Sequence, residues 1–475
     1  MGVTVRTGVV WSAFALLGCG SAEPSEAETE QSSSATSSDT SSGGTSITPT
    51  SSEASSGGGP TSGSTSSDGG SMSDADESGT TGETAPSDCD RLDVFVEELG
   101  RAEPKTVDAA IDTFVREAQY GGHGLPFRCD DRVVFVAVAS GPLFVAGDFN
   151  DWEPLPMTRP VDGAPLLVAD VPVEVPGGLY KLVDGELFIA DPLARRYGWD
   201  RFGEYSLVDS DSGRSHHERW PAFGEAVEPL QPRTLRVYVP AAANAAEDVA
   251  VLVMHDGQNL FDPEGISGGW RASQTAEQMI AEDEIDPVLI VAIDNTSARF
   301  EEYTHVTDDI GGGPIGGQAD DYADFVVEGV LPFIAERYPT RSGPGNTAVL
   351  GSSLGGLVSL HLAHRHPDVF GAVGSMSGTL GWGTFGLDNE TMLDRYADTA
   401  PAGLLVYVDS GGAGPCPGGS GDNYCENVAF ADLMRSLGWV DEDDLFYRWD
   451  PEAPHNEVAW ASRFGIALGV LSSGQ

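Results

Sequence analysis

The sequence predicts an α/β protein built on a doubly wound, mostly parallel sheet, with a small all-β sandwich before it and a disordered tether at the N-terminus. Two patterns predict this fold class. Beyond residue 232, short apolar runs alternate with segments of helical periodicity, as in a parallel sheet with helices on both faces. Residues 131–210 instead hold short strand-like runs separated by turn residues, which is typical of a sandwich.

The α/β part is expected to place its site at one edge of the sheet, because ligands of such folds bind beyond the carboxyl ends of the strands. In chain order the strand candidates are 234–239, 249–254, 288–293, 347–350, 372–375, 404–408 and 445–449, and the helix candidates are 274–281, 322–337, 357–364 and 428–437.

The domain organisation follows from shifts in composition along the chain. We expect an export signal over 1–19, a linker over 20–87, a helical arm over 88–130, the sandwich over 131–210, a second linker over 211–231 and the α/β domain over 232–475. The second linker is expected because it is polar and contains two prolines. Its His216 and His217 are expected to be solvated.

The charge of the chain excludes one class of partner. There are 25 Lys and Arg residues against 74 Asp and Glu residues, which gives a net charge of −49. Nucleic acid binding needs a basic face, so nucleic acid is not an expected partner. Acidic runs such as 441–444 lack the spacing of a calcium loop, so neither a metal nor a cofactor is expected.

The N-terminus reads as a targeting segment. Arg6 precedes the apolar run 9–17, which is too short to span a bilayer. The following Gly18-Cys19 resembles the lipobox of bacterial lipoproteins. That resemblance implies cleavage before Cys19, lipid on its sulfur and, since Gly20 follows, an outer-membrane location on the cell surface or the periplasmic face. An ordinary secretory signal is the alternative.

The linker over 20–87 is dominated by Ser, Thr, Gly, Glu and Asp and has no aromatic residue. Such a segment cannot bury a core, so it is expected to be a flexible tether of about 45 Å.

Four cysteines remain after Cys19, and an even number in an exported chain favours two disulfides. Proximity favours Cys89–Cys129 and Cys416–Cys425. Zinc ligation is the alternative, and it is disfavoured because no C-x-x-C pair exists.

A G-x-S-x-G motif spans Gly351–Gly355, with Ser353 at its centre. It lies between the apolar run 347–350 and the helical pattern 357–364, and this strand–turn–helix context is the one that a nucleophile elbow requires. The N-terminus of the helix favours developing negative charge. Ser353 is therefore predicted to be the nucleophile of an α/β-hydrolase.

The serine needs a base, and the base needs an acid. His455 follows the last predicted strand, which is where α/β-hydrolases carry their His. Asp409 and Asp422 compete for the acid position after strand 404–408, and the loser is expected to form a turn. Three other histidines are expected on a helix surface: His361, His364 and His366.

An oxyanion hole needs two backbone N–H groups. One is expected from Leu354, which follows the nucleophile. The other is expected from Gly257 or Gln258, in the loop after strand 249–254, because Gly257 permits an unusual backbone there.

Four motifs, MHDGQNLFD, RFEEY, GSSLGG and HNEVAW, together resemble the esterase family that includes enterochelin, feruloyl and acetyl-xylan esterases and bacterial mycolyltransferases. The resemblance runs from about residue 230 to the end. It favours Asp422 as the acid, since related esterases place the acid after a Gly and close to the next helix. GDFNDW and YKLVDG resemble the early-set module of glycogen-branching enzymes and of enterochelin esterases.

The expected function is therefore carboxylic-ester hydrolysis through a Ser-His-Asp triad and an acyl-enzyme, on a small-molecule or glycan-linked ester. A siderophore substrate is not assigned, because the chain looks exported and is poor in basic residues. Acyl transfer to a sugar would use the same triad. A non-catalytic, glucan-binding surface lipoprotein is the other alternative. Trp152 would then stack on a sugar, although a core anchor is the preferred role for that residue.

Overall fold

The computed structural model describes residues 87–129, 132–172, 178–209, 214–224, 229–265, 268–400, 403–416 and 421–473. All of them belong to one compact unit. The expected signal, the lipidation site Cys19 and the tether up to residue 86 lie outside the described residues. In the part of the chain that is described, no helix is both long and apolar enough to cross a bilayer.

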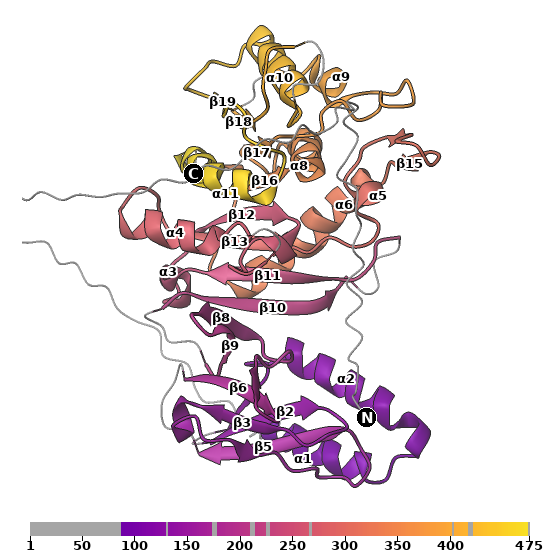
Figure 1. Cartoon of the computed structure of the whole chain (residues 1–475), viewed down its shortest axis with the longest axis vertical. Coiled ribbons are helices and arrows are strands. Elements are labelled where there is room, and N and C mark those ends of the chain that lie inside the picture. The colour runs from indigo at the N-terminus through magenta and orange to yellow at the C-terminus, as the bar shows by residue number, and fades with distance from the viewer. Residues whose placement is uncertain are drawn as a thin grey trace, which may run out of the picture. The chain divides into compact units, whose positions relative to one another are not determined.

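Two helices open the described chain and pack on a small sheet (Figure 1). Helix α1 (Asp88–Leu99) starts at a capping box, in which Ser87 and Asp90 each accept the other's backbone N–H. A disulfide between Cys89 and Cys129, with Cα atoms 6.1 Å apart, joins α1 to the sheet. The other elements here are η1 (Pro104–Thr106), α2 (Val107–Tyr120), β1 (Phe127–Cys129), β2 (Arg132–Val138) and β5 (Leu166–Pro172), with sheet order β1-β2-β5.

A second group of antiparallel strands faces β2 and β5 across an apolar core that contains Phe135 and Tyr180. The predicted sandwich is therefore present. Its second layer consists of β3 (Phe144–Gly147), η2 (Asp148–Asn150), β4 (Leu155–Pro156), β6 (Leu179–Asp184), β7 (Leu187–Ile189), β8 (Arg196–Asp200) and β9 (Gly203–Leu207).

Trp152 is not a core anchor, so that expectation was wrong. Its side chain is half-buried, and its Nε1 donates to Asp148 Oδ1 at 3.0 Å. Asp151 and Trp152 both have a positive φ in the turn after η2. Phe149, itself partly buried, packs against the core instead, with its ring 5.2 Å from that of Phe135.

All seven predicted strands of the α/β part are present, in a mixed sheet of order β19-β18-β17-β16-β12-β13-β11-β10-β8. In this sheet β12, β13, β16, β17, β18 and β19 run parallel, whereas β10 and β11 are antiparallel to their neighbours. The bounds are β10 (His216–Phe223), β11 (Arg233–Val239), β12 (Ala250–His255), β13 (Val288–Ile293), β16 (Thr347–Ser352), β17 (Ala372–Met376), β18 (Leu405–Ser410) and β19 (Leu445–Trp449).

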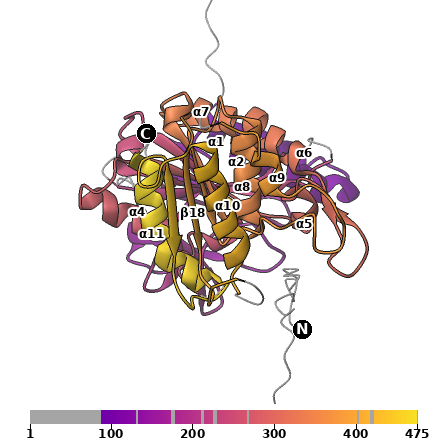
Figure 2. The same cartoon turned by 90° about the horizontal axis from the view of Figure 1, so that it is seen from above.

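Helices cover both faces of this sheet. One face packs on α4 (Ala272–Ala281) and α11 (Glu457–Ser473), and the other on the continuous helical run α6 (Ala319–Asp324), η5 (Phe325–Val330) and α7 (Leu331–Arg337), on α8 (Leu354–Arg365) and on α10 (Tyr424–Leu437). Figure 2 shows α4 and α11 on one side of β18 and α8 and α10 on the other. The connecting segments hold α3 (Ala241–Asn244), η3 (Gly257–Asn259), α5 (Arg299–Glu302), β14 (Thr307–Asp308), β15 (Ile315–Gly316), η6 (Pro344–Asn346) and α9 (Met392–Tyr396).

Helix α8 is buried on nearly every side, which corrects the expected surface position of its histidines. His361 is only 1% exposed, and its Nε2 lies 3.0 Å from Asp320 Oδ1. His364 and His366 are half-buried. The helix packs on its own sheet and also contacts α6 and α9, so polar residues along it do not mark a solvent face.

The segment 211–231 is not a linker. Its central part forms β10, which pairs with β11 on one side and with β8 of the sandwich on the other. His216 and His217 are 7% and 8% exposed rather than solvated. The polarity of the segment was misleading because its charges find partners when the chain folds: Glu218 lies 3.2 Å from His216 Nε2 and 3.1 Å from Arg196 Nε of the neighbouring strand β8.

Removal of the two disulfides should destabilise the protein unequally. The Cys89–Cys129 ring is larger than the Cys416–Cys425 ring, with sequence separations of 40 and 9. Chain entropy alone then gives losses of about 3.9 kcal/mol for Cys89→Ser and about 2.7 kcal/mol for Cys416→Ser. Urea unfolding under non-reducing conditions measures both, and Cys129→Ser should match Cys89→Ser. A larger loss for Cys416→Ser would contradict this ranking.

Candidate active site

Ser353 lies in the turn between β16 and α8. Its backbone has φ +56° and ψ −122°, a conformation that non-glycine residues rarely adopt and that is found mainly at functional sites. The two flanking glycines allow it, because a Cβ on Gly351 would lie 2.5 Å from the backbone of Gly355. The N–H of Ser353 donates to Met376 O at 2.9 Å, which fixes the turn on β17.

A continuous chain of hydrogen bonds links three of the predicted site residues. His455 Nε2 lies 2.9 Å from Ser353 Oγ, and His455 Nδ1 lies 2.8 Å from Asp422 Oδ1. The His455 ring stands edge-on against Trp460, with centroids 4.9 Å apart. Residues from three separate loops therefore meet beyond the carboxyl ends of the parallel strands, where the sequence placed them.

The structure separates the two candidate acids. Asp422 has φ +48° and directs one carboxylate oxygen to His455 and the other to Ser377 Oγ, at 2.7 Å. Asp409 lies within β18, fully buried, and accepts from Arg463 Nε at 3.1 Å and from Tyr407 OH at 2.9 Å. Asp409 is therefore an ion-pair partner in a strand and not the turn former that was expected of the losing residue.

Ser377 and Arg463 support the acid loop, and sequence reasoning missed both. Ser377 Oγ accepts from Arg463 Nη2 at 2.9 Å and from Trp460 Nε1 at 3.1 Å while it donates to Asp422. Arg463 spans Asp409 and Asp422, whose Oδ2 lies 3.6 Å from its Nη2. A signal existed, because Arg463 interrupts the apolar terminal helix and is 4% exposed.

Thr379 is a further residue that the sequence did not reveal. Its Oγ1 lies 3.3 Å from Ser353 Oγ and accepts from Asn423 Nδ2, also at 3.3 Å. Asn423 in turn donates to Ser377 O at 2.9 Å. The loop after β17 is thereby tied both to the serine and to the segment that carries Asp422.

The loop after β12 carries the second expected oxyanion donor. Its left-handed residue is Asp256, with φ +59°, and not Gly257. Gly257 is required for a different reason than the one expected: a Cβ there would lie 2.8 Å from the Ala292 carbonyl carbon and from Asp294 Oδ1. Gln258 Oε1 accepts from Asn295 N at 3.0 Å, which holds this loop on the end of β13.

A buried ion pair fixes the conformation of Asp256. Arg299, from the RFEEY motif, donates to both of its carboxylate oxygens at 2.7 Å. Burial opposes ionisation of Asp256, but the charge and hydrogen bonds of Arg299 outweigh it and hold the pKa of Asp256 below its ordinary value. Asp256 Oδ2 lies close to Gly355 in the first turn of α8, so this loop lies beside the elbow.

Leu354 is the first residue of α8. N–H groups in the first turn of a helix have no intrahelical partner. They point out of the N-terminus, which is the positive end of the helix dipole. The arrangement is compatible with the two-donor oxyanion hole predicted from Leu354 together with Gly257 or Gln258. Across the described residues, no group of three or more His, Cys, Asp or Glu side chains is arranged to hold a metal ion.

Comparison with known proteins identifies the family. Residues 228–469, about half of the chain, match the family described as Putative esterase. The chain is 28% identical over 141 residues to the uncharacterized protein YjcH of Bacillus subtilis, a match that covers 30% of this chain and 53% of YjcH. It is 28% identical over 152 residues to iron(III) salmochelin esterase of Escherichia coli O6:H1, covering 32% of this chain and 33% of that protein.

A solved structure, ferric enterobactin esterase from Salmonella typhimurium, aligns with a TM-score of 0.42 and 16% identity over 72% of this chain and 93% of that one. The chain spans only a third to about half of the length of the curated relatives named above.

The described chain combines a mixed sheet, covered by helices on both faces, with a serine, a histidine and an aspartate joined by hydrogen bonds beyond the carboxyl ends of its parallel strands. The chain belongs to the Putative esterase family, which confirms the membership that its motifs predicted.

Glu426, near the start of α10, has an unusual protonation equilibrium. Its Oε2 accepts from Gly381 N at 2.9 Å, and its Oε1 has no hydrogen-bond partner among the described residues. Burial raises the pKa of Glu426 to about 7. The side chain is therefore largely protonated in the folded protein in slightly acidic solution.

Glu426→Gln should flatten the pH dependence of stability. The unfolded chain releases this proton near pH 4.5, whereas the folded chain keeps it up to about pH 7. The wild-type protein therefore loses unfolding free energy as pH rises through this window, by roughly 3 kcal/mol at most. Urea unfolding between about pH 4.5 and 8 measures the slope, with Glu282→Gln as the exposed control. Equal slopes for wild type and Glu426→Gln would contradict the prediction.

Proposed function

We propose that the protein hydrolyses carboxylic esters with Ser353 as nucleophile, His455 as general base and acid, and Asp422 as the carboxylate that orients His455. One observation supports this above the others: the unbroken hydrogen-bond chain from Ser353 Oγ through both ring nitrogens of His455 to Asp422, at an elbow with a strained serine. A serine hydroxyl becomes an effective nucleophile only when a base lies within such reach.

The reaction proceeds in two half-reactions. Ser353 Oγ attacks the ester carbonyl carbon while its proton passes to His455 Nε2, and the oxyanion that forms is bound by backbone N–H groups of Leu354 and of Gly257 or Gln258. The C–O bond to the alcohol then breaks, and His455 gives its proton to the leaving oxygen. Water repeats the sequence on the acyl-enzyme and releases the acid and free Ser353.

Asp422 keeps Nδ1 of His455 protonated and stabilises the imidazolium that forms during each transfer. Its second oxygen is held by Ser377, which Arg463 and Trp460 hold in turn. This support restricts the acid loop to one orientation, although the loop contains left-handed residues at Asp422 and Asn423.

The proposed substrates are small-molecule or glycan-linked esters. The name of the salmochelin esterase relative points to an ester of a siderophore as one member of this class, and family membership alone supports the class. Acyl transfer to a sugar hydroxyl would differ from hydrolysis only in the acceptor that attacks the acyl-enzyme.

We also propose that the protein is exported and anchored in the outer membrane through lipid on Cys19, on the basis of its apolar 9–17 run and the Gly18-Cys19 pair. The sandwich, with its GDFNDW and YKLVDG motifs, is proposed to be an early-set module. Trp152 and its neighbour Phe188 are partly exposed, and these two side chains are proposed to make a weak contact with glucans.

Ser353→Ala should lower kcat for p-nitrophenyl esters by about 10³-fold or more, with little change in melting temperature, because a half-exposed hydroxyl contributes little to stability. His455→Ala should be similar, and the double variant barely worse, since the two residues act as a unit. A fluorophosphonate probe should label Ser353 in the wild type only. Near-normal turnover or labelling in Ser353→Ala would refute the assignment.

Asp409→Ala should mainly lower stability, whereas Asp422→Ala should mainly lower activity. Loss of Asp409 leaves the buried Arg463 without its main counter-ion, which should cost about 3–5 kcal/mol of unfolding free energy. Loss of Asp422 should instead reduce kcat by at least about 10³-fold. Urea unfolding and ester hydrolysis, measured on both variants, separate the two effects. A catalytic defect confined to Asp409→Ala would reverse the acid assignment.

A further inference from the structure

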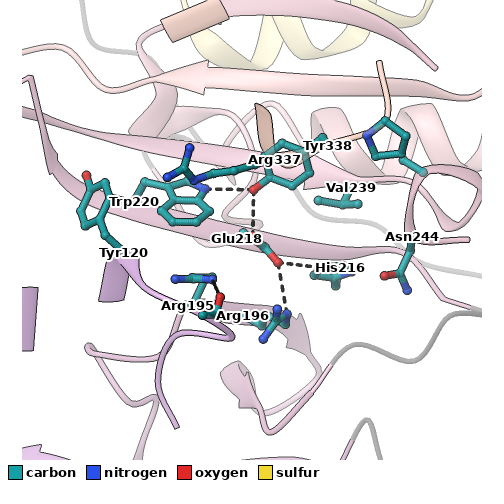
Figure 3. A pocket seen from close by; sticks show the side chains of 13 residues that line it. Tyr120, Arg195, Arg196, His216, Glu218, Trp220, Val239, Asn244, Arg337 and Tyr338 are labelled. Atoms are coloured by element: carbon teal, nitrogen blue, oxygen red, sulfur yellow. Dashed lines mark hydrogen bonds and ion pairs between the residues drawn. The ribbon is translucent and has the colours of Figure 1, made fainter. Parts of the chain in front are cut away.

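A pocket lies at the junction of the sandwich, α2 and the α/β part (Figure 3). Its volume is about 270 Å³. Val239 and Pro339 line it, and Pro339 O accepts from Val249 N just before β12 begins. The pocket therefore lies at the amino end of β12, whereas the Ser353 site lies at the carboxyl end. A strand of this length separates the two by roughly 20 Å.

The walls of this pocket carry an unusual concentration of positive charge. Arg195, Arg196 and Arg337 all line it, in a chain that has only 25 basic residues against 74 acidic ones. One carboxylate, Glu218, lines it with them. Arg337 also pairs with Glu336 at 3.0 Å, but that carboxylate is 77% exposed and so is screened by solvent.

Glu218 is already fully engaged. It is 6% exposed, accepts from Tyr338 OH at 2.8 Å, and lies 3.1 Å from Arg196 Nε and 3.2 Å from His216 Nε2. Burial opposes its ionisation, but His216 and Arg196 outweigh burial and lower the pKa of Glu218 to about 2. A single permanent negative charge therefore faces three guanidinium groups.

Arg195 has no carboxylate of its own. Its guanidinium donates to the backbone carbonyls of Gln119, Gly121 and Gly122, and it stacks over Trp220 at 4.2 Å. Burial and the neighbouring guanidinium groups lower the pKa of Arg195 to about 10, against the opposing pull of Glu218. The charge of Arg195 is therefore rigidly held but only partly compensated.

Two buried polar atoms on the pocket walls have no hydrogen-bond partner among the described residues. Arg196 donates from Nη1 to His123 O, whereas its Nε lies 3.1 Å from Glu218 Oε1 but is buried without a hydrogen bond in the described part of the chain. His216 is 7% exposed, and its Nδ1 is buried without a hydrogen-bond partner among the described residues. A buried polar atom of this kind normally finds a partner.

We propose that this pocket binds a tetrahedral oxyanion, either inorganic phosphate or the phosphate group of a phosphomonoester. Two uncompensated positive charges match a dianion, and the forked geometry of guanidinium groups suits phosphate oxygens. The pocket has room for such a group with a small substituent. Because its walls come from α2, β8, β10 and α7, a bound oxyanion would crosslink the sandwich to the α/β part.

Isothermal titration calorimetry on the full-length protein tests the site, with inorganic phosphate as the probe and chloride used to keep ionic strength constant. One saturable site is expected. Arg337→Gln and Arg196→Gln should each weaken the affinity by at least about tenfold, since each removes a charge-assisted hydrogen bond. Arg435→Gln is the matched control: it is a half-buried arginine on α10 and should bind like wild type.

Arg337→Gln leaves all three partners of Glu218 in place, so it should fold normally, and p-nitrophenyl ester hydrolysis provides the check on folding. Glycerol phosphate identifies the source of the group: tighter binding than inorganic phosphate assigns a phosphomonoester, and weaker binding assigns the free ion. Absence of saturable binding, unchanged affinity in both arginine variants, or tighter binding of succinate than of phosphate would overturn the proposal.

Discussion

The buried ion pair between Arg463 and Asp409 is the constraint on which the arrangement of the site depends. Two charges taken out of water are stable only with close geometry and further hydrogen bonds, and this pair has both: Asp409 also accepts from Tyr407. The pair locks α11 against β18. His455 lies just before α11, and Arg463 lies inside it, so one docked helix positions His455 and also supports the loop that carries Asp422.

Residues with strained backbone conformations cluster around the Ser353 site. Five non-glycine residues near it have a positive φ: Asp256, Ser353, Ser377, Asp422 and Asn423. Each is held by bonds that leave it little freedom, as when Ser353 N donates to Met376 O and Ser377 N to Asp409 O, both at 2.9 Å. Strained conformations persist only where the surroundings over-determine them. Here the rigid strands of the sheet provide these surroundings, and the strained residues lie in the loops at the carboxyl ends of the strands.

Much of this could be predicted from the sequence, and the failures have physical causes. Periodicity identified the seven strands of the α/β part, and the motif context identified Ser353 and His455, because both signals are local. Local patterns could not reveal that β10 buries His216 and His217, since a polar strand whose charges pair with residues of neighbouring strands resembles a linker. They also could not choose between Asp409 and Asp422, because the choice depends on Arg463, a residue more than forty positions away from either in the chain.

The errors at Trp152 and Gly257 are of another kind. In both cases the residue was rightly singled out, but the structural role predicted for it was wrong. Gly257 has an ordinary φ and is needed because β13 approaches too closely for a side chain. Phe149 makes the contact with the sandwich core that Trp152 was expected to make. The residue type at such positions depends on contacts between segments that are distant in the sequence, and these contacts cannot be read from local sequence patterns.

Strand β10 covers an edge of the α/β sheet that would otherwise be exposed. Without β10, strand β11 would lie at the margin of the sheet, with a row of unpaired N–H and C=O groups open to other chains. Exposed margins of this kind template strand-to-strand association. Strand β10, which pairs with β11 on one side and with β8 of the sandwich on the other, therefore covers an edge at which other chains could otherwise add a strand.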